Sequence, residues 1–120
     1  MPDMRAALAL LIAATPAMAN DFEPVRDKAR FLDLISGKEL RNGLYNITLR
    51  VDPTGEISGQ ALGWKITGNW TWQDGYFCRT MDWEGYAIPH NCQLVEVRDA
   101  SVVRFTVDRG TGDSAAFRLK

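Results

Sequence analysis

The chain has 120 residues, of which 46% are hydrophobic and 24% are charged, and its formal net charge at pH 7 is −1. Since no block of basic residues occurs anywhere, nothing in the charge pattern indicates a nucleic acid or an anionic membrane surface as a partner. A chain of this length suits one domain of ordinary size.

Residues 1–19 are predicted to be a secretory signal peptide. Arg5 supplies positive charge, residues 6–14 form an apolar run, and Ala17-Met18-Ala19 has the pattern of a cleavage site. The apolar run is about half of the roughly 20 residues that span a bilayer, so we expect no stable membrane anchor. Residues 20–120 would then be a single β-barrel-like domain that is periplasmic or secreted.

A single helix is predicted, over residues 22–35. Pro24 suits its first turn, and Gly37 can adopt the left-handed conformation that ends a helix. The apolar residues that recur at helical spacing are Val25, Ala29, Leu32 and Ile35. We expect this helix to cover one end of the remaining structure.

After the helix the hydrophobic period becomes two, and turn residues recur at short intervals. This pattern predicts a mainly β fold, a small antiparallel meander of about seven strands that forms a barrel or half-barrel. Closure into a barrel would also hide exposed sheet edges. The strands are predicted at residues 44–51, 57–62, 64–73 with a kink at Gly68, 76–81, 92–97, 102–107 and 116–119.

Residues 63–92 contain all four tryptophans, both cysteines and the only histidine. Trp70 and Trp72 are two apart, so in a strand both rings leave the same face. Asp74-Gly75 is a turn dipeptide of tight hairpins, which predicts a hairpin with arms at residues 69–73 and 76–81. Residues 82–91 are predicted to be the longest loop.

Cys78 and Cys92, in an exported chain, most simply form one disulfide. Such a bond closes a loop of about 15 residues and would contribute on the order of 3 kcal/mol. Two free thiols, or a metal site with His90, are the alternatives. Because the spacing lacks the paired short intervals of zinc motifs, we predict no metal.

Trp83, Tyr86 and His90 are the candidate ligand- or partner-binding residues, because loops carry function more often than strands do. The strand tryptophans either line an apolar cup or fill the core, and we favour the core. His90 has no second histidine and no placed nucleophile beside it, so we predict no catalytic residue and no cofactor. The glycine-rich residues 109–114 are expected to be a flexible hairpin connection.

Three segments carry a resemblance to a group of short exported bacterial proteins, namely DPTGEISGQALGW, GNWTWQDGYFC and NCQLVEV. In that group a β-meander carries a tryptophan-rich centre and two cysteines, and some members are labelled dihydrodipicolinate reductase. The architecture is also similar to calycin-type binding proteins. The reductase label implies a dinucleotide-binding unit, but the only glycine-rich run, residues 109–114, lies too near the carboxyl end to begin one.

These observations favour a small exported binding protein of the bacterial envelope, which takes a small apolar ligand or a protein partner. The alternative is an enzyme of the reductase type. A binding protein needs an open apolar cavity or an exposed aromatic patch, whereas an enzyme needs converging polar groups in a cleft.

Overall fold

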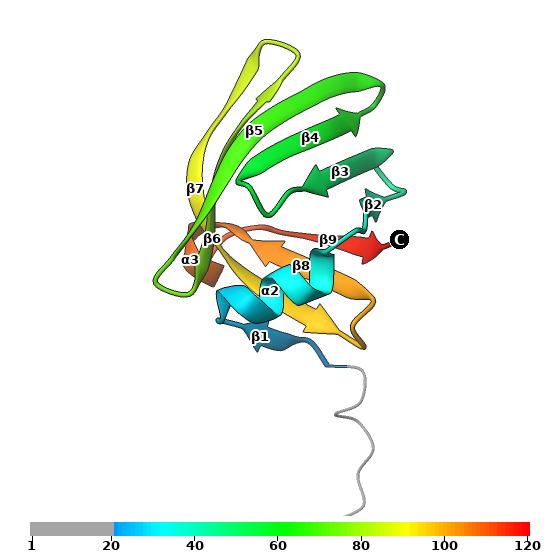
Figure 1. The fold of residues 1–120 in the computed structure, drawn as a ribbon. Coiled ribbons are helices and arrows are strands. Elements are labelled where there is room, and N and C mark those ends of the chain that lie inside the picture. Colours follow the sequence, from blue (N-terminus) through cyan, green and yellow to red (C-terminus); the bar gives the residue numbers. More distant parts are fainter. Residues whose placement is uncertain (1–20) are drawn as a thin grey trace, which may run out of the picture.

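The computed structural model describes residues 21–120, so the predicted signal peptide lies outside the described residues. Within them, nine strands form one antiparallel sheet (Figure 1). The strands are β1 (Glu23–Val25), β2 (Leu40–Asn42), β3 (Ile47–Val51), β4 (Glu56–Ala61), β5 (Trp64–Gln73), β6 (Tyr76–Trp83), β7 (Tyr86–Arg98), β8 (Val102–Thr106) and β9 (Ser114–Leu119).

The strands from β2 to β9 close into an eight-stranded barrel. Each of them pairs with its neighbour in the chain, and β9 returns to pair with β2. The short strand β1 lies outside this ring and pairs with the carboxyl half of β7. The prediction of a mainly β barrel is therefore confirmed, and the ring is closed rather than half-open.

The helix is shorter than predicted. It is α2 (Lys28–Ile35), and Asp27 caps it by accepting a hydrogen bond from the backbone N–H of Ala29 at 3.4 Å. The residues before it form β1 instead, because Val25 can be buried against the barrel from a strand as well as from a helix. Pro24 is tolerated there because β1 is an edge strand, where a missing N–H leaves no ladder bond unmade.

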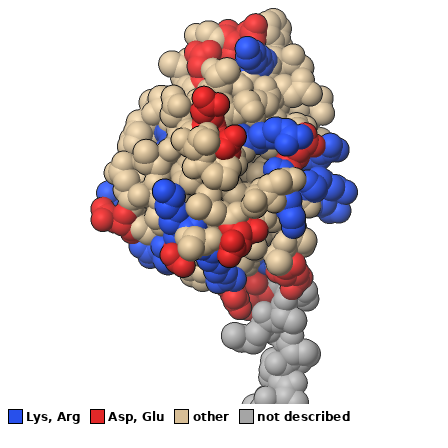
Figure 2. Space-filling model, viewed as in Figure 1, with Lys and Arg blue, Asp and Glu red and all other residues tan. Residues whose placement is uncertain are grey.

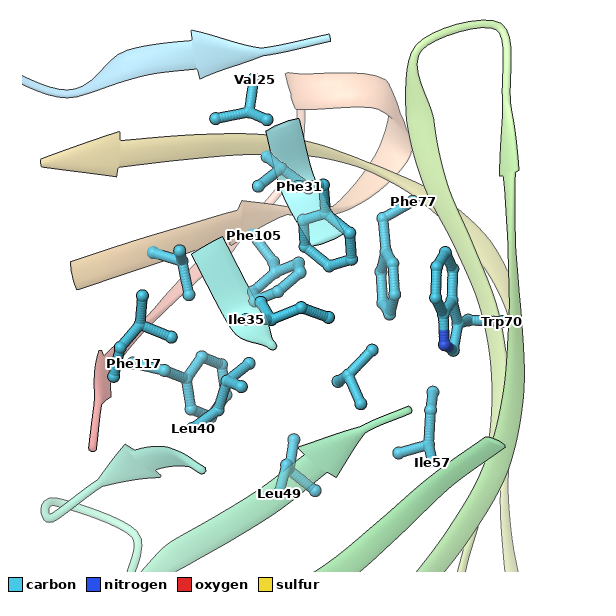
Figure 3. Close-up of a cluster of buried hydrophobic side chains, with 14 of the residues drawn as sticks. Val25, Phe31, Ile35, Leu40, Leu49, Ile57, Trp70, Phe77, Phe105 and Phe117 are labelled. Atoms are coloured by element: carbon cyan, nitrogen blue, oxygen red, sulfur yellow. The ribbon is translucent and has the colours of Figure 1, made fainter. Parts of the chain in front are cut away.

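Helix α2 packs its apolar face onto the barrel and completes the core at one end. Phe31 and Ile35 of α2 are fully buried, and Figure 3 shows them beside Phe77, Phe105 and Trp70. The ring of Phe31 meets the ring of Trp70 edge-on, with the ring centroids 5.6 Å apart. The expectation that the helix covers one end of the barrel therefore agrees with this packing.

Two hairpins dominate the tryptophan-rich stretch. The predicted turn Asp74-Gly75 joins β5 to β6, and both residues have positive φ, 54° and 83°. The predicted long loop at residues 82–91 is wrong, because β6 continues to Trp83 and the tight turn Glu84-Gly85 leads directly into β7. Glu84 adopts a φ of 48° there, a strained value that the pattern of turn residues did not suggest.

As predicted, residues 64–73 form one strand, β5, which runs unbroken through Gly68. Gly68 allows β5 and β6 to approach each other closely. A Cβ at residue 68 would collide with the backbone carbonyl of Thr80 on β6. Its role is therefore to let two strands of a small barrel approach each other.

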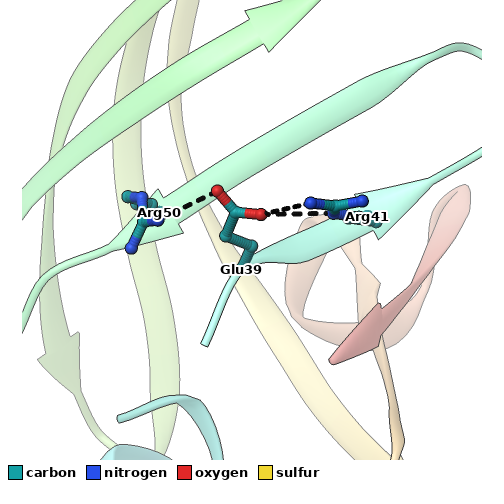
Figure 4. Close-up of polar contacts among 3 residues, drawn as sticks. All are labelled: Glu39, Arg41 and Arg50. Carbon is teal, nitrogen blue, oxygen red and sulfur yellow. Dashed lines mark hydrogen bonds and ion pairs between the residues drawn. The ribbon is translucent and has the colours of Figure 1, made fainter. Parts of the chain in front are cut away.

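Charged side chains of both signs are interspersed on the outside of the barrel, and basic ones gather at the right of the view in Figure 2. One acidic residue of the barrel, Glu39, pairs with two arginines. Glu39 accepts hydrogen bonds from Arg41 and, at 3.0 Å, from Arg50 (Figure 4). In the described part of the chain, no helix has the length and apolar character needed to cross a membrane.

Candidate functional site

An apolar cavity of about 270 Å³ lies inside the barrel. Side chains from most of the barrel strands contribute to its wall. The lining residues are Leu40, Leu49, Val51, Ile57, Phe77, Arg79, Met81, Gln93, Phe105, Val107, Asp113, Ser114, Ala115 and Phe117. Most of them are hydrophobic, as in pockets that hold small organic molecules.

The alternation of side chains along β6 determines which of its residues line the cavity. Phe77, Arg79 and Met81 are two apart, share one face of the strand and all line the cavity. On the neighbouring strand, Trp70 lies opposite Arg79 and Trp72 lies opposite Phe77. None of the four tryptophans lines the cavity. Trp70 fills the core, as expected, but the expectation was wrong for Trp64, which is exposed at the start of β5.

Arg79 is the distinctive polar group of the cavity. Its side chain is buried, with 8% of the residue exposed, and its Nη1 donates a hydrogen bond to the carbonyl of Pro89 at 2.7 Å. Within residues 21–120, no carboxylate lies within ion-pair distance of its guanidinium. Burial lowers the pKa of Arg79 from its ordinary value, because desolvation disfavours the charged form.

A β-bulge in β7 presents the carbonyl that Arg79 uses. Arg79 lies opposite Asn91, whereas Met81 lies opposite Ile88, so β7 has one more residue than β6 between these pairs. Pro89 occupies this irregular segment, where its missing N–H disrupts no ladder bond. Bulges of this kind re-aim groups beside functional sites.

The cavity reaches the surface near the amino end of β9. Asp113, Ser114 and Ala115 line the cavity and are also exposed, so they mark its mouth. The hydroxyl of Ser114 shares a hydrogen bond of 2.7 Å with the hydroxyl of buried Thr106, which fixes this side of the opening.

The connection beside the mouth joins the antiparallel strands β8 and β9, as expected for a hairpin connection at residues 109–114. It contains a short helical turn, α3 (Val107–Gly110), in which Asp108 and Arg109 have φ values of 56° and 55°. Asn91 of β7 holds the turn, because its amide donates to Asp108 Oδ1 at 2.8 Å and accepts from the Asp108 N–H at 2.9 Å. Left-handed residues of this kind persist where surrounding contacts determine them.

Of the predicted binding residues, Trp83 and Tyr86 face each other across the end of the β6–β7 hairpin. With Trp64 and Glu84 they surround a shallow surface hollow. Tyr86 is 72% exposed and Trp64 is 57% exposed, whereas Trp83 is half-buried and donates its Nε1–H to the carbonyl of Ala61 at 3.1 Å. We call Trp64, Trp83 and Tyr86 the aromatic patch.

The third predicted residue, His90, lies elsewhere on β7. One of its ring nitrogens is within 4.8 Å of the sulfur atoms of Cys78 and Cys92. The predicted disulfide between these cysteines is present, and it joins residues directly opposite each other on β6 and β7. Because a metal binds the thiolate form of cysteine, the bonded sulfurs leave His90 alone as a donor in this state.

No family model, no curated protein and no solved structure matches this chain. The cavity and the aromatic patch are therefore interpreted from their own geometry and chemistry.

Sequence reasoning did not identify Arg79 and Gln93, the two buried polar residues of the cavity wall. A signal for Arg79 was present. It stands in phase with Phe77 and Met81 on a strand whose apolar positions face inward, so an arginine at that position indicates a charge within the barrel.

Proposed function

We propose that this protein is a small exported binding protein that holds a small, mainly apolar molecule inside the barrel. The observation that carries this proposal is the apolar cavity of about 270 Å³. Its volume lies just below the range of roughly 300–1,000 Å³ for ligand pockets. A dry apolar cavity of about 150 Å³ already suffices to bind benzene, so a ligand somewhat larger than benzene fits.

Export, to the periplasm or the exterior, belongs to the same proposal. Disulfides persist in oxidising compartments, and Cys78 is bonded to Cys92. The signal sequence at residues 1–19 supports the same location.

A mutation at the cavity mouth tests the binding proposal. Ala115→Trp would place a large ring at the opening, while the position itself is exposed and tolerates a change of size. Ala116→Trp is the matched control, because the next residue of β9 faces the outside of the barrel. With 1-octanol as the probe, calorimetry should detect binding to the wild type and to the control and much weaker binding to Ala115→Trp. Equal binding to all three proteins would contradict an interior site.

A protein partner in the envelope is the second candidate, and the aromatic patch favours it. Trp64 and Tyr86 are exposed large aromatics at neighbouring hairpin ends, and tyrosine and tryptophan are enriched where protein interfaces concentrate their binding energy. Tyr86→Ala should leave the melting temperature unchanged and weaken recovery of a cross-linked partner from the envelope. A partner recovered equally well with this variant would place the contact elsewhere.

The enzyme alternative is a reductase that binds a dinucleotide. Titration of NADH and NADPH against the tryptophan fluorescence distinguishes it from the binding proposal. We expect no saturable change, because residues 109–114 lie where the antiparallel strands β8 and β9 connect, whereas a dinucleotide-binding unit needs a strand, a glycine-rich turn and a helix. Saturable quenching by either cofactor would favour the reductase.

A further inference from the structure

We propose that the ligand of the barrel carries an anionic group, of the carboxylate type, which pairs with the guanidinium of Arg79. This inference rests on the proposed function, since it specifies the chemistry of the molecule that occupies the same cavity. The expected ligand is thus a small amphipathic acid, with its apolar body against the barrel wall and its charged end at Arg79.

The first step of the argument is the cost of the arginine where it lies. Arg79 is buried in a mainly apolar wall, and no carboxylate among residues 21–120 neutralises it. A buried charge is expensive unless it is paired and hydrogen-bonded. If position 79 served only to fill the wall, an apolar residue there would make the protein more stable. We therefore infer that the charge of Arg79 pairs with a group on the ligand.

The second step concerns the hydrogen bonds that the guanidinium has left. The bond to Pro89 uses one of its five N–H donors. In the described part of the chain, no fully enclosed side-chain nitrogen or oxygen lacks a hydrogen-bond partner. The remaining N–H donors of Arg79 are therefore not fully enclosed by protein. Since Arg79 lines the cavity, these donors are available to a molecule inside it.

The third step is the geometry of a complementary group. A guanidinium presents parallel N–H bonds that match the two oxygens of a carboxylate. The bond from Nη1 to Pro89 restrains the guanidinium, so part of the ordering entropy is lost before the ligand binds. Such preorganisation is typical of a binding site rather than of a surface arginine.

The other polar groups of the cavity wall are compatible with this arrangement. Gln93 is buried, and its amide can donate a further hydrogen bond to an anion. Asp113 is the one carboxylate of the wall, and it lies exposed at the mouth, where water and salt screen its charge. The apolar remainder of the wall accommodates the body of the ligand.

The test compares octanoate with 1-octanol, which share an apolar chain and differ in the charged end. Calorimetry at about pH 7, where a carboxylate is ionised, should show that the wild type prefers octanoate by at least about tenfold. Arg79→Met removes the charge at similar length and should abolish this preference while octanol still binds. Arg79→Lys should retain part of it, and Arg41→Met, on the outside of the barrel, should retain all of it.

The outcomes separate the two proposals. If octanol binds at least as tightly as octanoate, or if the preference survives in Arg79→Met, the anionic ligand is wrong and the apolar cavity proposal stands. If neither probe binds the wild type, both proposals fail. Should the Arg79 variants not fold, the Nε–H resonance of Arg79 in the wild type decides, since it should shift on addition of octanoate and not of octanol. An Nε–H resonance that octanoate leaves unmoved would overturn the inference.

Discussion

The indole ring of Trp72 stacks on the ring of Phe31, with the ring centroids 5.0 Å apart and the planes 29° from parallel. The Trp72 Nε1–H also reaches the carbonyl of Arg26 at 3.2 Å, just before the helix. Trp72 thus contacts both the backbone of the segment before α2 and the buried face of α2. Trp70 and Trp72 of β5 therefore join the helix and the barrel into one core.

Trp70→Ala should therefore be strongly destabilising. The ring is 5% exposed, packs against Phe31 and Phe77, and donates its Nε1–H to the carbonyl of Asp52 at 2.8 Å. Truncation of a large aromatic in a core typically costs about 3–5 kcal/mol. Urea denaturation should show this loss, whereas Trp64→Ala, at an exposed position of the same strand, should change stability by less than about 0.5 kcal/mol. Similar losses for both variants would contradict a structural role specific to Trp70.

Removal of the disulfide should lower stability without changing the fold. Replacement of both Cys78 and Cys92 with Ser should cost about 2–4 kcal/mol, the usual range for a native bond in a small domain. Chemical denaturation of the double variant and of the reduced wild type measures the same loss by two routes. If the denaturant midpoint were unchanged in both samples, the disulfide would contribute nothing to stability and the prediction would be wrong.

The protein from its native host should begin at Asn20. Cleavage after Ala19 follows from the charged amino terminus, the apolar run and the Ala17-Met18-Ala19 pattern. Mass spectrometry of the envelope fraction measures the terminus directly. Recovery of the intact chain from the cytoplasm would contradict export.

Glu39 should contribute a pH-dependent term to stability. Its pKa is lowered from the ordinary value of 4.5, mainly by the hydrogen bond from Arg41. Desolvation opposes this effect, and the charges of Arg41 and Arg50 and the hydrogen bond from Arg50 lower the pKa further. A carboxyl with a lowered pKa in the folded state stabilises the protein above its unfolded pKa. That contribution disappears as the pH falls through the folded value.

Thermal unfolding of the wild type and of Glu39→Gln measures this dependence. The wild type should melt slightly higher at neutral pH, and the difference should fade as the pH drops below about 4.5. Glu23→Gln, an exposed position on β1, controls for loss of a carboxylate elsewhere. A difference that grows towards acid pH would contradict the assignment.

Much of this architecture followed from local patterns. The alternation of apolar residues and the turn Asp74-Gly75 predicted the barrel strands and the first hairpin, because both signals are contained within a few residues. The second hairpin was missed since Glu84-Gly85 is a weaker turn signal and Pro89 argues against a strand. Only the register of β6 against β7 shows that the proline sits in a bulge.

The candidate site was less predictable. Trp83 and Tyr86 were correctly placed close together, but on the ends of strands rather than in a loop, and His90 lies beside the disulfide. The cavity depends on closure between β2 and β9, a pairing between distant parts of the chain that no local pattern encodes. That Arg79 lines the cavity could be established only from the structure, which shows which face of β6 points into the barrel.

The joint between β2 and β9 has a further consequence for the order in which the molecule assembles. It consists of the pairs Leu40–Leu119 and Arg41–Arg118, with two flanking backbone hydrogen bonds between Glu39 and Lys120. Contacts that join segments so far apart in sequence form late, because the intervening chain must be ordered first. The strand β2 has only three residues and pairs with β9 through two of them, so its amide protons should exchange with solvent faster than those of the β5–β7 hairpins. Because β9 is the strand that closes the ring onto β2, the barrel can close only after β9 has been synthesised and ordered.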